Sequence, residues 1–142
     1  MAAQFDRDGV RFLYPENWTL EGEDTDTGWT VSVQSPDTAF LVIALDQNMP
    51  DTETMARTAL NALEEEYKDL ESEEALESIA GQPAIGHDVR FFSFDLTNSC
   101  AIRSFYSSRG TILLMWQAND LELAHNEPVL RAITASMKVD ND

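Results

Sequence analysis

The chain has 142 residues, a length that suits one domain, residues 1–142, with a hydrophobic core of its own. Hydrophobic residues make up 43% of it and no apolar run approaches the roughly 18 residues that a membrane-spanning helix needs, so composition excludes a wholly disordered chain and a transmembrane helix. The formal net charge of −17 repels phosphate groups, and we therefore expect neither nucleic acid nor an anionic membrane surface as a partner.

The acidic residues are concentrated in the first part of the chain. Residues 1–80 hold 19 carboxylates against 4 Lys and Arg, whereas residues 81–142 hold 7 against 5. Basic proteins, cationic peptides and divalent metals are the partners that such a field attracts. A simpler interpretation, in which the charge only confers solubility, stays open.

The N-terminus and the cysteine content indicate an intracellular protein. Residues 1–8 lack the basic and apolar regions of a signal peptide. Cys100 is the single cysteine, which excludes an internal disulfide and is compatible with a reducing compartment. We therefore expect a cytoplasmic location.

Alternating and apolar patterns predict several strands in the first third of the chain. Residues 10–20 predict two extended segments separated by a turn at Pro15. The polar residues 21–28 predict a loop, and residues 29–34 predict a strand with its apolar side chains on one face. Residues 40–45 are apolar throughout, which predicts a central strand covered on both faces.

A helix and an ambiguous acidic segment are predicted next. Asp51 or Thr52 is suited to cap the helix, whose apolar residues share one stripe. That stripe consists of Met55, Ala59, Leu60, Leu63 and Tyr67. Residues 69–77 are so acidic that a fraying helix and an edge strand both fit them, although Ala75 and Ile79 favour the strand.

The predicted sheet is organised around residues 84–118. Three segments rich in aromatic and β-branched residues are separated by polar breaks at 97–99 and 107–110, a pattern typical of an antiparallel meander. The third segment is apolar at every position from Ile112 to Trp116, so it should be buried on both faces. We therefore expect helices on both sides of the sheet.

A second helix is predicted to close the chain. Asn119 or Asp120 opens this region, and Pro128 suits the first turn of its main part better than its interior. Its apolar stripe consists of Val129, Leu130, Ile133 and Met137.

The order of the predicted elements and several local motifs together resemble the Mog1/PsbP family, which includes DcrB-like proteins. Domains of this family have α+β folds. The motifs are the aromatic strand, proline turn and tryptophan at 12–18, the turn at 35–37, the Gly-Gln-Pro stretch at 79–84 and the Ser-Met-Lys closure at 133–138. This resemblance implies an α/β/α sandwich, an antiparallel sheet with helices packed on both faces. Together the motifs cover nearly the whole chain.

The family resemblance also implies a role without catalysis. Members of the family that are understood act mostly by binding other proteins: an extrinsic subunit of photosystem II, a factor that binds the Ran GTPase, DcrB-like proteins and secretion chaperones. We therefore expect a protein partner and no enzyme activity, as an analogy at the level of the fold.

Motifs for nucleophilic or cofactor chemistry are missing. Cys100 opens a predicted strand, where a buried apolar role is usual, and His87 and His125 are expected to be surface or capping residues. The sequence contains no Gly-x-Ser-x-Gly elbow and no glycine-rich phosphate loop. We expect no catalytic residue and no cofactor.

Two charged clusters are candidate ligand sites. Residues 21–28 carry Glu21, Glu23, Asp24 and Asp26 but lack the remaining ligands of a calcium loop, so we expect a solvated loop and no metal site. Arg90, Arg103 and Arg109 lie on the meander, either pairing with the acidic half or surrounding an anionic ligand.

The leading candidate site is a run of eight acids within fourteen residues, here called the acidic segment. Its members are Glu64, Glu65, Glu66, Asp69, Glu71, Glu73, Glu74 and Glu77. Such a run is a solvated face or an interaction segment, and it would steer a basic protein partner towards the chain. We predict that the acidic segment is the recognition surface of a protein-binding or complex-assembly domain.

Two alternative functions stay open. A chaperone or adaptor would hold a hydrophobic segment of its partner in a groove lined by Phe92, Phe94, Phe105 and Tyr106. A small-molecule carrier would use a pocket between the sheet and a helix.

Overall fold

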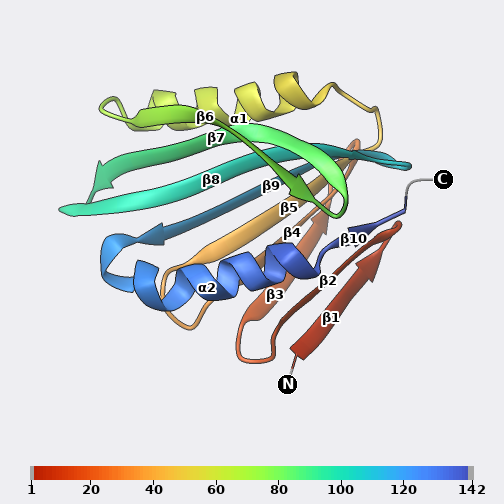
Figure 1. Cartoon of the computed structure of the whole chain (residues 1–142), viewed down its shortest axis with the longest axis horizontal. Coiled ribbons are helices and arrows are strands. Elements are labelled where there is room, and N and C mark those ends of the chain that lie inside the picture. The colour runs from red at the N-terminus through yellow and green to blue at the C-terminus, as the bar shows by residue number, and fades with distance from the viewer. Residues whose placement is uncertain (1, 141–142) are drawn as a thin grey trace.

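The computed structural model describes residues 2–140 and contains two helices and ten strands. The strands are β1 (Ala2–Arg7), β2 (Val10–Pro15), β3 (Thr19–Asp24), β4 (Gly28–Gln34), β5 (Phe40–Asp46), β6 (Glu71–Ile79), β7 (Gln82–Ser93), β8 (Leu96–Ser107), β9 (Gly110–Asn119) and β10 (Lys138–Val139). The helices are α1 (Thr52–Glu66) and α2 (Asp120–Ser136). Figure 1 shows both helices lying along one large twisted sheet.

The large sheet has seven antiparallel strands in the order β3-β4-β5-β9-β8-β7-β6. β9 is the middle strand, and its apolar residues Ile112 and Trp116 lie opposite Leu45 and Leu41 of β5. The predicted meander of β7, β8 and β9 is confirmed. Of the two alternatives left open for residues 69–77, the structure shows the edge strand, as β6. An uninterrupted apolar run thus marks the strand that is most deeply embedded in the sheet.

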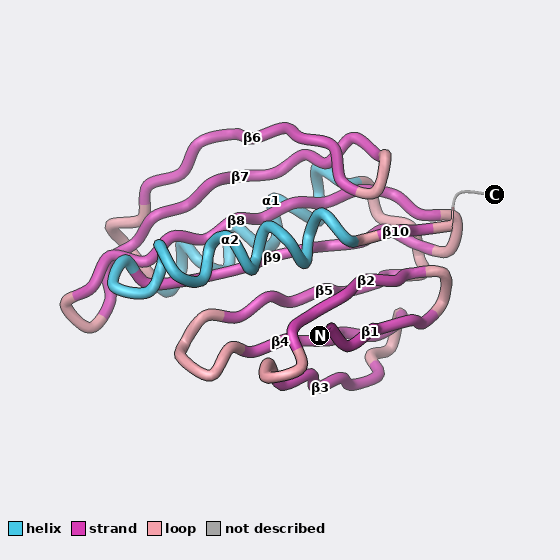
Figure 2. Tube along the Cα trace, turned by 60° about the horizontal axis from the view of Figure 1, so that its bottom comes forward, coloured by secondary structure: helices cyan, strands magenta, loops and turns pink. Residues whose placement is uncertain are grey.

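Side chains of β9 alternate between two cores. Leu113 and Met115 pack against the core under α1, which is formed with β7 and β8. Ile112 and Leu114 belong to the larger core under α2, which reaches across β4 and β5 to β2. In Figure 2, α2 lies in front of β8 and β9 and α1 lies behind them. The predicted α+β class, with a mainly antiparallel sheet and two helices, is confirmed.

Cover of the sheet is less even than an α/β/α sandwich implies. On the α2 side, a three-stranded sheet of β1, β2 and β10 shares the cover with the helix, and Phe5 of β1 packs on Phe12 and on Trp29 of β4. On the other side α1 lies over β7, β8 and β9. Leu41, Ile43 and Leu45 of β5 are consequently buried, whereas the alternate residues of β5 are half-buried. The expectation that residues 40–45 are covered on both faces is met only in part.

Three predicted boundaries are wrong for identifiable reasons. β1 was not predicted, although Asp8-Gly9 in the sequence is a strong signal for a hairpin turn. In the structure both turn residues have positive φ (51° and 78°). Residues 21–24 belong to β3, so the predicted loop shrinks to the turn before Gly28. The first break of the meander lies at Phe94 and Asp95, both left-handed, and not at 97–99, which pairs within β8.

Both helices carry the predicted caps. The Asp51 side chain accepts a hydrogen bond from the Thr54 amide (2.7 Å), which lowers the pKa of Asp51, and Asn119 caps α2 in the same way. The placement of Pro128 in a first turn is wrong, because α2 runs unbroken through it from Asp120 to Ser136. Its missing N–H costs one intrahelical hydrogen bond, and α2 continues past it with Asn126 and Leu130 buried on either side.

Gly86 tests how closely β7 and β8 approach. A Cβ at Gly86 would lie 1.8 Å from the carbonyl oxygen of Ile102, whereas at Gly22 the nearest atom is 3.6 Å away. We expect Gly86→Ala to lower the free energy of unfolding by about 1–3 kcal/mol or more, because backbone must move to admit the methyl group. Urea denaturation checks this, with Gly22→Ala as the matched control. Equal effects of the two substitutions would contradict the close approach.

Candidate protein-binding surface

The acidic segment lies along one end of the sheet. Glu64, Glu65 and Glu66 occupy the last turn of α1, Asp69 follows in the connection, and the remaining four lie on β6, all eight being exposed. β6 is the last strand of the large sheet. The segment therefore rims an open sheet edge.

Successive residues of β6 point to opposite faces, which divides its acids. Glu77 reaches Arg103, and Ile79 belongs to the core under α2, so odd-numbered residues such as Glu71 and Glu73 face the α2 side. Glu74 pairs in register with His87 and faces the α1 side. The eight acids, predicted to form one surface, are thus distributed over two faces of the sheet edge.

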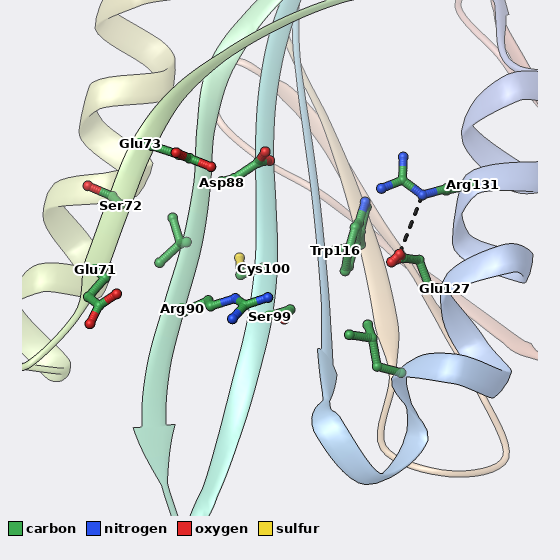
Figure 3. A pocket seen from close by; sticks show the side chains of 12 residues that line it. Glu71, Ser72, Glu73, Asp88, Arg90, Ser99, Cys100, Trp116, Glu127 and Arg131 are labelled. Atoms are coloured by element: carbon green, nitrogen blue, oxygen red, sulfur yellow. Dashed lines mark ion pairs between the residues drawn. The ribbon is translucent and has the colours of Figure 1, made fainter.

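A groove separates the acids of β6 from α2. It consists of two adjoining hollows of about 430 and 300 Å³, and Trp116 and Arg131 line both. Figure 3 shows Glu71, Glu73 and Asp88 on the strand side of the larger hollow and Glu127 and Arg131 on the helix side. The lining of the larger hollow is Glu71, Ser72, Glu73, Asp88, Val89, Arg90, Ser99, Cys100, Trp116, Leu123, Glu127 and Arg131.

Arg103 holds the smaller hollow together. Its Nε donates to Oε2 of Glu77 (2.5 Å), and one terminal nitrogen donates to Oδ1 of Asp88 (2.8 Å). The other terminal nitrogen donates to the carbonyl oxygens of His87 (3.2 Å) and Ile102 (3.0 Å). Only 8% of Arg103 is exposed. This cation thus ties β6, β7 and β8 together while it neutralises two carboxylates of the groove.

The three predicted meander arginines do not form one cluster. Arg103 pairs with acids, as the first interpretation expected, whereas Arg109 pairs with Asp8 (3.6 Å) at another turn. Arg90 has no ion pair among residues 2–140. An anion site formed by all three is therefore wrong, since their side chains go to different partners.

The larger hollow carries more acid than base. Glu71, Glu73, Asp88 and Glu127 line it against Arg90 and Arg131. Arg131 is already paired with Glu127 at 3.6 Å, one helical turn apart. Carboxylates that face a shared, partly enclosed space make that space attractive to cations.

Substitution of Arg103 tests its role as the tie between strands. Arg103→Met leaves Glu77 and Asp88 without their cation and the carbonyl of His87 without its donor, so we expect a loss of about 1–3 kcal/mol in unfolding free energy. Arg90→Met is the matched control, because it removes an exposed arginine from the neighbouring strand. Chemical denaturation of both variants gives the comparison, and similar losses would mean that the buried bonds of Arg103 add nothing.

His87 lies on the opposite face of β7 and is buried, with 8% exposed, so the prediction of a surface or capping residue is wrong for it. It lines a hollow of about 410 Å³ together with Arg57, Glu74 and Leu76. Burial and the positive charge of Arg57 lower the pKa of His87, and Glu74 offsets part of this shift. Covered by α1, this histidine is a neutral group of the sheet packing. The second histidine, His125, is exposed, as predicted.

The lowered pKa makes the stability depend on pH. Below the ordinary histidine pKa of 6.5, the unfolded chain binds a proton that folded His87 resists, so stability falls as pH drops through that value. We expect the stability difference between pH 7.5 and pH 5.5 to shrink in His87→Gln, and His125→Gln, which removes an exposed histidine, is the matched control. Thermal unfolding at both pH values measures it; an unchanged pH dependence in His87→Gln would contradict the assignment.

Cys100 is the remaining candidate for nucleophilic chemistry. Cys100 is buried as predicted, with 2% exposed, and burial raises the pKa of its thiol to about 12. A thiol with that pKa stays protonated and unreactive at neutral pH.

The four aromatics proposed for a hydrophobic groove are not brought together. Phe92 and Phe94 are exposed at the turn between β7 and β8, Phe105 is fully buried, and Tyr106 lies beside the start of α1. None of the four lines the hollows beside Trp116, beside His87 or beside Pro128.

The acids at 21–28 lie mostly on a strand instead of a loop. Asp24 pairs with Arg7 at 2.8 Å. Residues 2–140 contain no group of three or more His, Cys, Asp or Glu side chains arranged to hold a metal ion. Neither helix, in the part of the chain that the structure describes, has the length and apolarity to cross a bilayer.

The sequence analysis missed the helix side of the groove. Trp116 was assigned to a buried strand, but it is half-buried and lines both hollows. Glu127 and Arg131 are four residues apart, a spacing that predicts an ion pair on a helix face. That spacing was the available signal for the pair, but not for the groove beside it.

Comparison with known proteins identifies the fold. No family model and no curated protein matches the sequence. A crystal structure from Bacteroides thetaiotaomicron VPI-5482 matches with a TM-score of 0.66 at 11% identity, over 98% of this chain and 48% of that one, so this chain spans about half its length. The solution structure of cyanobacterial PsbP (CyanoP) from Synechocystis sp. PCC 6803 matches with a TM-score of 0.57 at 13% identity, over 97% and 92%.

A further match extends the comparison. LpqN of Mycobacterium tuberculosis, described as involved in cell envelope biogenesis, has a TM-score of 0.58 at 12% identity, over 99% of this chain and 91% of that one. At these identities the likeness establishes the fold alone. The predicted resemblance to PsbP is confirmed at that level.

Proposed function

We propose that this chain, which has the PsbP fold, is a protein-binding or complex-assembly domain without enzyme activity, and that it recognises a basic region of its partner. The observation that carries the proposal is the excess of carboxylates around the groove and along the open edge of β6. Glu71, Glu73 and Asp88 face the groove from the strands, and Glu127 faces it from α2.

The placement of charge at the end of α1 also supports a binding role. Glu64, Glu65 and Glu66 occupy its last turn, which contains no basic residue. Carboxylates are unfavourable there because the end of the helix dipole is itself negative. Local rules of stability are commonly broken where a protein uses the residues for something else. A basic partner would relieve this repulsion.

Electrostatic recognition of this kind acts mainly on the rate of association. Clustered surface carboxylates attract a basic partner over roughly 8–10 Å at physiological salt, and added salt weakens the attraction. The cellular location of the protein is a separate question, and a cytoplasmic location stays a prediction. The similarity to LpqN, which is described as involved in cell envelope biogenesis, suggests the cell envelope as the alternative.

The test is partner capture from a native lysate at low and at high salt. We expect the parent to retain partners at low salt and to lose them both at high salt and when Glu64, Glu65, Glu71, Glu73 and Glu74 are changed to Gln. Mass spectrometry of the retained proteins identifies them.

A matched control removes the same number of charges elsewhere. Its changes are Glu16, Glu21 and Glu23 to Gln and Asp26 and Asp37 to Asn, all exposed. We expect this control to keep the partners. Equal losses in both variants would show that net charge matters and the acidic segment does not, and an unchanged set of partners would overturn the proposal.

A further inference from the structure

β6 is a long strand with one free side. It pairs with β7 without interruption from Glu71 opposite Arg90 to Ile79 opposite Gln82. It is also the last strand of the seven, so no strand within residues 2–140 covers its other side. An uncovered edge presents a row of backbone N–H and C=O groups that a further strand can bind.

The turn before β7 determines which backbone groups face outward. Ala80 and Gly81 both have positive φ (55° and 78°), the conformation of a two-residue hairpin, which makes Ile79 and Gln82 a hydrogen-bonded pair. Because hydrogen-bonded and non-hydrogen-bonded pairs alternate, every second residue of β6 turns its N–H and C=O away from β7. These residues are Ser72, Glu74, Leu76 and Ser78.

Pro83 agrees with this assignment. It lies opposite Ser78, at a position where β7 has no hydrogen bond to donate to β6. Proline has no N–H, so it is tolerated in a strand only at such positions. Four alternate residues of β6 thus present a free N–H and C=O at the edge, which is enough to pair with a segment of about eight residues.

The side chains beside this edge indicate what kind of segment fits. On the groove side, Glu71 and Glu73 stand next to Asp88. On the α1 side, Glu74 and Leu76 line the hollow beside His87, and 73% of Leu76 is exposed. A matching segment carries basic side chains on its groove face and an apolar side chain opposite Leu76.

The same charges argue against a second copy of this chain. Pairing of two β6 edges would bring the glutamates of one copy against those of the other, and like charges directly opposite one another destabilise a strand pair. Acidic residues along an open edge therefore reject self-association and admit a strand of opposite charge.

We propose that an extended basic segment of a partner protein binds as an eighth strand on β6, with alternate Lys or Arg side chains directed at Glu71 and Glu73. This inference rests on the proposed function, and it deepens it by naming the form of the partner. Backbone bonding supplies affinity at the edge, and the alternation of charge supplies specificity.

The probe is a fluorescent, end-capped peptide of eight residues, Lys-Thr-Lys-Val-Lys-Thr-Lys-Val. A twin methylated at every internal amide nitrogen keeps all side chains and charges but cannot donate hydrogen bonds to an edge. Fluorescence anisotropy at low salt measures both. We expect the twin to bind the parent protein at least tenfold more weakly than the probe does.

Leu76→Pro tests the protein side. Its N–H faces outward, so proline removes one donor at the edge while the hydrogen bonds between β6 and β7 and all charges remain. We expect at least tenfold weaker binding of the probe, whereas Leu76→Ala, which keeps the N–H, weakens binding less. Thermal unfolding and hydrogen exchange of β7 check that the ladder is intact; should the proline variant prove unfolded, the methylated twin alone decides.

The outcomes separate this inference from the proposed function. Equal binding of probe and twin, or no binding of the probe at all, overturns the eighth strand, while salt-dependent capture lost in the five-glutamine variant would still support an acidic recognition surface. In a third outcome, the probe binds and the twin does not, but neither added salt nor the glutamine substitutions weaken the binding of the probe. This outcome would support a strand-binding edge and would contradict the electrostatic proposal.

Discussion

The middle strand β9 is the constraint on which the remaining structure depends. Ile112 and Leu114 belong to the core under α2, and Leu113 and Met115 pack under α1. Because side chains alternate with a period of two, a slip by one residue would exchange the contents of both cores. The register of β9 with β5 and β8 therefore fixes, at once, which face of the sheet each helix covers.

The position of the groove follows from that arrangement. α2 packs on β2, β8 and β9, and α1 packs on β7, β8 and β9, so β6 extends past both helices. Its residues are exposed except for Ala75, which is half-buried, and Ile79, which is buried. Between Glu71 and Ser78 neither face of β6 enters a core, so this part of the strand can carry glutamate on both faces. Arg103 neutralises Glu77 and Asp88, and the other acids stay available to a partner.

Sequence reasoning succeeded where one physical signal was strong and failed where two competed. The apolar run at Ile112 placed β9 at the centre of the sheet, and Asp51 and Asn119 marked both helix starts. Thr97 to Ser99 have the composition of a turn, but their pairing with β7 prevails over composition. The groove was beyond reach, because it joins Glu73 to Glu127 across two elements whose packing no local pattern encodes.

The last described residues close the fold. The Asp140 amide donates to the carbonyl oxygen of Gly9 (2.9 Å), and its own carbonyl accepts from the Ser108 amide (2.8 Å), so it bridges the β1–β2 turn and the β8–β9 turn. Lys138 and Val139 pair with Arg11 and Val10, at the other end of the chain. Val10 and Phe12 of β2 therefore lack their final neighbours until residues 138–140 have been synthesised. Contacts so distant in sequence slow folding, because a long loop must close before they form.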